Sequence, residues 1–148
     1  MEDYSEIFNR FAKEYVDKFQ SMNGDWDKLS TDEQEIVALW SFGADMFMGG
    51  FLDFFLAYGY DVYLTAMRGI ERVGCKKLYK LVEKTYKKVL DRFQNDKRIT
   101  SYDDIPQYLT ERDEKILDDL FEKFDEEYGE QLCEAAYKFY SGKNRLIP

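Results

Sequence analysis

Hydrophobic residues recur along most of the chain at the spacing of one helix face. In the segment 4–19, for example, apolar side chains fall every three or four positions and charged ones lie between them. No stretch alternates apolar and polar residues over the length of a strand, so the pattern predicts an all-α protein. The expected helices cover seven segments: 4–19, 31–47, 51–58, 61–73, 75–93, 111–128 and 130–142.

Signals for helix ends separate these segments. Ser30 precedes Glu33 by three residues, which is a capping box, so a helix is predicted to begin at about Thr31. Gly59 and Gly129 each follow an apolar stretch and are predicted to end helices, because glycine readily adopts the left-handed conformation that follows a last turn. The connections are short except over residues 94–107, where a loop is expected.

Length and composition favour a packed interior. The chain has 148 residues, of which 45% are hydrophobic and 18% aromatic. Aromatic side chains bury large areas, and a chain of this length suits one core. The prediction is a single-domain bundle of about seven short to medium helices that covers residues 1–148.

Charge is unevenly distributed around a formal net charge of −9. Residues 68–98 contain eleven basic and four acidic side chains, with most lysines between Lys76 and Lys88. Residues 111–127 contain nine acidic and three basic side chains. The acidic face expected to bind a partner consists of Asp113, Glu114, Asp118, Asp119, Glu122, Asp125 and Glu126.

The residue types present exclude several catalytic chemistries. The chain has no histidine, so Ser–His–Asp and Cys–His catalysis and histidine-based metal sites are excluded. No glycine-rich phosphate loop occurs. We therefore expect no enzyme activity, no metal and no cofactor. The one alternative is an enzyme that uses buried carboxylates, for which Asp45, Asp53 and Asp61 are the candidates.

The cysteines and the lack of long apolar runs indicate a cytoplasmic protein. Cys75 and Cys133 are isolated, which is typical of reduced thiols in a cytoplasmic protein. No run of about 20 apolar residues is present and the first residues are acidic, so neither a membrane helix nor a signal peptide is expected.

Two glycines interrupt an apolar stretch, "ADMFMGGFLDFF" at residues 44–55. A turn between two apolar helices needs a backbone without Cβ atoms, and the phenylalanines can fill the space around it. We therefore interpret this stretch as a packing corner rather than a ligand loop.

The same stretch resembles a family of small helical bacterial proteins, otherwise of unknown function, whose named representative is a DNA-mimic protein. The resemblance covers roughly residues 30–142. Met48 stands where that family has Asn, and Asp53 where it has Gln. The positions that match its pattern, and that form the expected structural motif, are Asp45, Gly49, Gly50, Phe51, Phe54, Phe55 and Gly59.

The resemblance implies a non-catalytic regulatory or inhibitory protein. Such a protein binds a protein partner, and as a DNA mimic it occupies the basic surface of a DNA-binding protein. The alternative is an immunity-type protein against a basic nuclease, or a homo-oligomeric interaction module, with no DNA mimicry. Direct nucleic-acid binding is not expected, because the net charge of −9 opposes it. A homodimer is left open.

Overall fold

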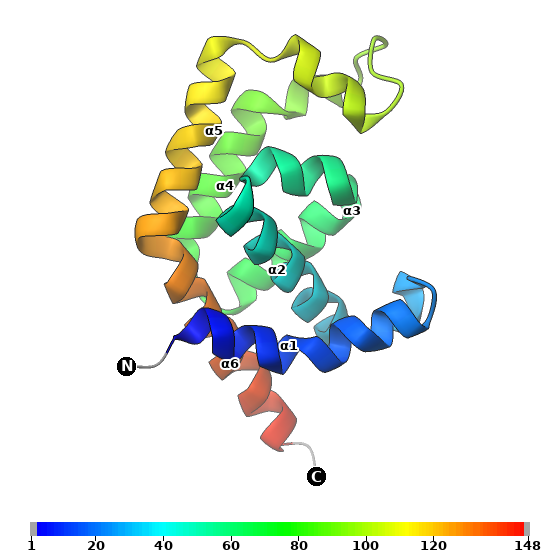
Figure 1. The fold of residues 1–148 in the computed structure, drawn as a ribbon, viewed down its shortest axis with the longest axis vertical. Helices are drawn as coiled ribbons and strands as arrows, with labels where there is room; N and C mark the ends of the chain where they lie inside the picture. Colours follow the sequence, from blue (N-terminus) through cyan, green and yellow to red (C-terminus); the bar gives the residue numbers. More distant parts are fainter. Residues whose placement is uncertain (1–2, 147–148) are drawn as a thin grey trace.

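The computed structural model describes residues 3–146, with side chains described over residues 3–142. Within this range the chain is helical and contains no strand, which confirms the all-α prediction (Figure 1). Its six α-helices are α1 (Tyr4–Ser21), α2 (Thr31–Met48), α3 (Phe51–Arg72), α4 (Lys76–Val89), α5 (Glu111–Lys123) and α6 (Gly129–Leu146). Short 3-10 segments cover Trp26–Lys28, Asp91–Phe93 and Tyr102–Tyr108, and a π-helical segment covers Phe124–Tyr128.

The helices pack around α2 and α3. Figure 1 shows α5 running down one side of the molecule, with α4 beside it, and the chain continuing through the π-helical segment into α6, which crosses α1 at the lower end. Helix α1 crosses the lower part of the molecule and packs against α2 and α6. This arrangement leaves the outer side of α5 without a neighbouring helix among the described residues.

Helix α2 begins where the capping box predicts. The Oγ of Ser30 accepts a hydrogen bond from the Glu33 amide at 3.2 Å, and the Glu33 carboxylate accepts one from the Ser30 amide at 2.9 Å. Two backbone donors that the first turn leaves unpaired are thereby satisfied.

The two glycines expected to end helices behave differently. Gly59 has φ +83° and ψ −174°, so it interrupts α3 and separates the two segments predicted there. The prediction for Gly129 is wrong, because this residue has helical angles of φ −62° and ψ −51° and the helix continues into α6. Space explains this: a Cβ atom at Gly129 would lie 2.6 Å from Cζ of Phe47. The glycine therefore serves close packing.

The predicted loop at 94–107 is also shorter than expected. Ser101 and Asp104 form a capping box that opens the 3-10 segment Tyr102–Tyr108. The side chain of Tyr102 packs edge-on against Phe55, with ring centroids 5.2 Å apart, so this segment covers the middle of α3.

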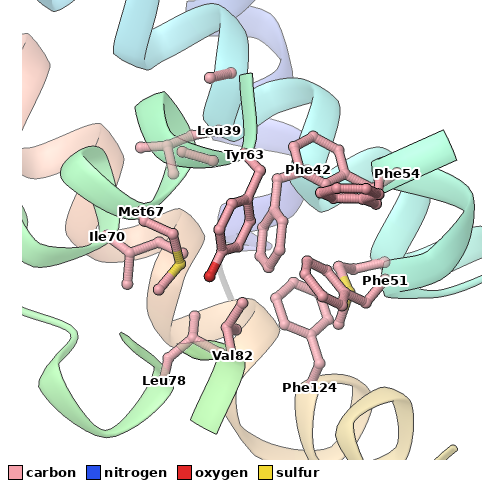
Figure 2. Close-up of a cluster of buried hydrophobic side chains, with 14 of the residues drawn as sticks. Leu39, Phe42, Phe51, Phe54, Tyr63, Met67, Ile70, Leu78, Val82 and Phe124 are labelled. Atoms are coloured by element: carbon pink, nitrogen blue, oxygen red, sulfur yellow. The ribbon is translucent and has the colours of Figure 1, made fainter. Parts of the chain in front are cut away.

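The core is built largely from aromatic rings. Phe42 of α2 makes edge-to-face contacts with Phe54 and Phe124, at centroid distances of 5.3 and 5.7 Å. Figure 2 shows these rings with Phe51 in one cluster, next to aliphatic residues of α3 and α4. Edge-to-face pairs add about 1 kcal/mol each beyond area burial. The cluster contains residues from all six α-helices, so α5 and α6 are fixed to the rest of the fold.

Candidate functional site

Helix α5 owes its orientation to one capping box and one ion pair. Thr110 Oγ1 accepts a hydrogen bond from the Asp113 amide at 3.1 Å, and Asp113 Oδ2 accepts one from the Thr110 amide at 2.8 Å. Asp113 also pairs with Arg92, whose Nη1 lies 3.1 Å from Oδ1. These bonds fix the start of α5 against the segment that follows α4.

Asp113 therefore does not belong to the exposed face where the sequence placed it. Its side chain is only 5% exposed. Hydrogen bonding from Arg92 lowers the pKa of the Asp113 carboxyl to about 2, against the opposing effect of burial, so the group stays ionised within the fold. Its role in the structure is to cap and anchor α5.

The other six residues of the acidic face are exposed: Glu114, Asp118, Asp119, Glu122, Asp125 and Glu126. None of them forms an ion pair with another described residue. Asp119 differs from the rest because it lies on the α4 side, in a shallow depression that Lys84, Lys88 and Lys123 also line. Its charge is thus partly balanced by the neighbouring lysines.

A continuous series of carboxylates runs along the remaining side of α5. Glu114, Asp118 and Glu122 are spaced four residues apart, which puts successive Cβ atoms about 5–6 Å apart on one side of a helix. Two further exposed carboxylates lie three residues beyond either end: Glu111 at the start of α5, and Asp125 in the adjoining π-helical segment. We call these five residues the acidic row. Arg112 and Lys123 fall on the other side of the helix. Lys115 lies at the edge of the row, four residues after Glu111 and three before Asp118. None of these three cations forms an ion pair with the row among the described residues.

The paired glycines form the turn between α2 and α3. The amides of Gly49 and Gly50 both donate to the Asp45 carbonyl oxygen at 2.8 Å, and Gly50 has φ +112°. A Cβ atom at Gly49 would lie 1.9 Å from Oδ2 of Asp53, so the carboxylate of Asp53 lies directly against the turn. Phe51, Phe54 and Phe55 are all buried in the core beneath it.

The three aspartates considered as enzyme candidates lie in different environments. Asp45 is half-buried, and burial together with the nearby Asp53 charge raises the pKa of its carboxyl. Asp53 and Asp61 are exposed, and Asp61 lies beyond the interruption at Gly59. No group of three or more acidic or thiol side chains among the described residues has the geometry of a metal site.

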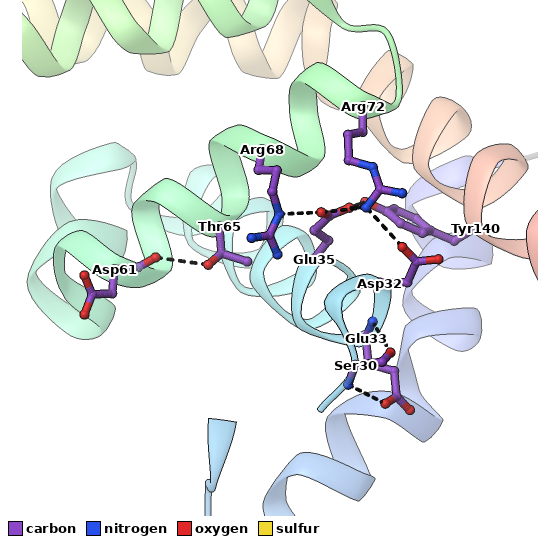
Figure 3. A network of polar contacts seen from close by, with 9 residues as sticks. All are labelled: Ser30, Asp32, Glu33, Glu35, Asp61, Thr65, Arg68, Arg72 and Tyr140. Carbon is purple, nitrogen blue, oxygen red and sulfur yellow. Dashed lines mark hydrogen bonds and ion pairs between the residues drawn. The ribbon is translucent and has the colours of Figure 1, made fainter. Parts of the chain in front are cut away.

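A buried ionic cluster joins α2, α3 and α6, and the sequence analysis missed it (Figure 3). Glu35 has no exposed surface. Its carboxylate accepts hydrogen bonds from Arg68 Nε at 2.6 Å, from Arg72 Nη1 at 2.7 Å and from the Tyr140 hydroxyl at 2.6 Å. Arg72 also contacts Asp32 at 3.0 Å. The signal in the sequence was an acidic residue next to Ile36 on the apolar side of α2, together with two arginines four residues apart in α3.

The lysines of α4 form a second charged surface. Lys76, Lys77, Lys80, Lys84, Lys87 and Lys88 are all exposed. Lys87 lies 3.8 Å from Glu83 in the same helix.

The described part of the chain contains no helix that meets the length and hydropathy needed to cross a membrane.

These features define a class of protein: an all-helical fold with an exposed row of carboxylates along one helix and, among the described residues, no group of side chains arranged as a metal site. A family model described as DMP19-like protein matches residues 27–146, and the chain belongs to this family. The match confirms the family expected from the sequence, over a slightly longer range. Family membership is compatible with a non-catalytic role in protein binding. The chain matches no curated protein and no solved structure.

Proposed function

We propose that the protein binds a basic DNA-binding protein through the acidic row of α5, and so keeps that partner from nucleic acid. The observation that carries this proposal is a row of five exposed carboxylates, none of which forms an ion pair with another described residue. The family assignment supports it, because the family suggests a DNA-mimic protein. A nuclease with a basic substrate channel is the alternative partner, as in the immunity-type hypothesis.

Charge spacing favours mimicry of one DNA strand. The acidic row extends over 14 residue steps, which is about 21 Å at 1.5 Å per residue, so successive charges lie about 5 Å apart along the axis. One strand of duplex DNA carries a charge about every 3.4 Å and both strands together one about every 1.7 Å. A surface that imitates both strands therefore needs further acidic groups, either from other helices or from a second subunit.

Identification of the captured partner shows whether it is a DNA-binding regulator or a nuclease. Competition between duplex DNA and this protein for the captured partner tests the mimicry. Immobilised protein is incubated with cell lysate, and retained proteins are eluted first with a short duplex DNA and then with salt. We expect DNA to release a DNA-binding protein, and retention to fall steeply with ionic strength because the contacts are ionic. Duplex DNA that releases nothing would contradict the proposal.

A matched pair of variants locates the contact. The row variant carries Glu114→Gln, Asp118→Asn and Glu122→Gln, and it should retain little of the partner. The control variant removes the same three charges elsewhere through Glu14→Gln, Asp61→Asn and Glu71→Gln, at exposed positions. Equal loss in both variants would show that net charge, not the acidic row, drives retention.

A further inference from the structure

A pocket of about 390 Å³ lies between the α2–α3 turn and α5. Gly49, Gly50 and the start of α3 line one side, and Glu114, Asp118 and Phe121 of α5 line the other. The end of the 3-10 segment Tyr102–Tyr108 contributes the third wall. The pocket therefore joins the two features that the sequence singled out separately, the glycine motif and the acidic face.

Part of the inner surface of this pocket is apolar, and the rest is polar. Phe51 is 1% exposed and Leu117 is 9% exposed, so both present only a small part of their surface there. Phe121 and Leu52 are half-buried, and their remaining surface is available to a ligand. A Cβ atom at Gly50 would lie 3.8 Å from Cδ2 of Phe121, an ordinary contact distance, so the Phe121 ring lies close to the turn.

The polar groups of the pocket all carry the same charge. Asp53, Glu114 and Asp118 line it, and no lysine or arginine does. None of the three carboxylates has an ion-pair partner among the described residues. Asp53 lies against Gly49, where any side chain would displace its carboxylate. The Asp53 charge also raises the pKa of Asp45 in addition to the effect of burial, so a cation at this place would relieve repulsion.

We propose that this pocket binds an arginine side chain of the basic partner. The aliphatic stem of arginine can pack against Leu52, and its planar guanidinium can stack on the ring of Phe121. Its fork of donors suits two carboxylates at once. Lysine has a point charge and cannot make the bidentate contact. This inference rests on the proposed function for the source of the arginine, and it adds a specific anchor to what would otherwise be a purely electrostatic surface.

The pocket is tested with a small probe, independently of any partner. N-acetyl-arginine methylamide is titrated into the full-length protein while backbone amide shifts are followed by NMR. We expect saturable shifts at Gly49, Gly50 and Phe121, and binding at least about tenfold weaker for the lysine derivative. The uncharged norleucine derivative should not bind. Equal shifts with lysine or norleucine would overturn the assignment of an arginine site.

Two pairs of substitutions separate the pocket from general charge attraction. Glu114→Gln with Asp118→Asn should weaken probe binding about tenfold, because it removes two of the three pocket carboxylates. Glu14→Gln with Glu71→Gln removes the same charge at exposed positions outside the pocket and should leave probe binding unchanged. Equal weakening by both would overturn the proposal. If the probe binds but DNA releases no captured partner, the proposed function fails and the pocket stands. If DNA releases a partner but the probe does not bind, the arginine pocket is rejected and the proposed function stands.

Discussion

The hydroxyl oxygen of Tyr140 lies 2.6 Å from Oε1 of Glu35, although 105 positions separate the two residues in the chain. The hydrogen bond joins α6 to α2 inside the core, where Tyr140 is 1% exposed and Glu35 is not exposed at all. Burial and the Glu35 carboxylate raise the pKa of Tyr140 above its ordinary value. The hydroxyl therefore remains a donor, and together with two arginines it satisfies a fully buried carboxylate.

Replacement of Tyr140 by Phe should lower the free energy of unfolding by about 1–2 kcal/mol, because it removes one hydrogen bond to a buried charge while keeping the ring. Urea denaturation followed by circular dichroism measures the change. Tyr137→Phe is the control, since Tyr137 is half-buried in the same helix and its hydroxyl makes no hydrogen bond with another described residue. The control should change stability by less than about 0.5 kcal/mol. Similar effects of both variants would contradict a stabilising role for the Tyr140–Glu35 bond.

Asp113 gives the fold a defined dependence on acid. Its pKa is about 2 in the folded protein against an ordinary value of 3.8, so folding is favoured where the carboxyl is ionised. This contribution is fully present above the unfolded value and is lost as the pH falls through about 2. Asp113→Asn should therefore cost about 1–2 kcal/mol at neutral pH, and the difference from wild type should shrink between pH 4 and pH 2.

Unfolding free energies measured by urea titration at a series of pH values test this expectation. Asp118→Asn is the control, because Asp118 is exposed and has no ion pair among the described residues. A cost for Asp113→Asn that stays constant down to pH 2 would show that the ion pair with Arg92 is not its source.

Gly129→Ala should destabilise the protein although alanine favours helices. A Cβ atom there would lie 2.6 Å from Cζ of Phe47 and 2.9 Å from the Phe124 carbonyl oxygen. Relief of these contacts should cost about 1–3 kcal/mol. Gly142→Ala is the matched control in the same helix, since a Cβ atom at that position meets nothing within 4 Å. It should be neutral or stabilising by up to about 1 kcal/mol, as helix propensity predicts. Thermal unfolding of the two variants compares them, and a stabilised Gly129→Ala would refute the steric account.

Gly59→Ala should cost more than Gly74→Ala, although both glycines have positive φ values of +83° and +89°. Both variants incur backbone strain of about 1–3 kcal/mol. Only at Gly59 does a Cβ atom also meet a ring, with Cε2 of Tyr102 at 2.9 Å, whereas the space around Gly74 is open. Chemical denaturation of both variants gives the difference. In a Tyr102→Ala background, Gly59→Ala should still incur the backbone strain. It should no longer lower the free energy of unfolding by more than Gly74→Ala does, because the ring that its Cβ atom meets is gone.

Much of the helical architecture was predictable because periodic apolar positions and local caps act within a few residues. The α2 capping box and the interruption at Gly59 are of this kind. The continuous helix through Gly129 could not be predicted locally. Its cause is the ring of Phe47, which comes from another helix and excludes any side chain at that position.

The acidic face of α5 was predictable in outline because it too depends on local helical periodicity. Helical periodicity places Glu114, Asp118 and Glu122 on one side of α5, and the structure leaves them exposed there. Asp113 differs because Arg92, 21 residues earlier, folds back against it. The pocket beneath Glu114 and Asp118 depends on Asp53 and the glycine turn, which only the tertiary fold brings next to α5.

The π-helical segment Phe124–Tyr128 has a consequence for how one helix serves two purposes. Tyr140 follows Glu122 by 18 residues, which is five full turns of α-helix, so an uninterrupted helix would point both side chains in the same direction. Glu122 faces solvent, however, and Tyr140 must reach Glu35 in the core. A π-helical turn holds about one extra residue and so rotates everything after it by roughly 100°. The segment therefore rotates the side-chain directions of α6 relative to those of α5. One continuous helix can then expose carboxylates in its first part and bury Tyr140 in the core in its last part.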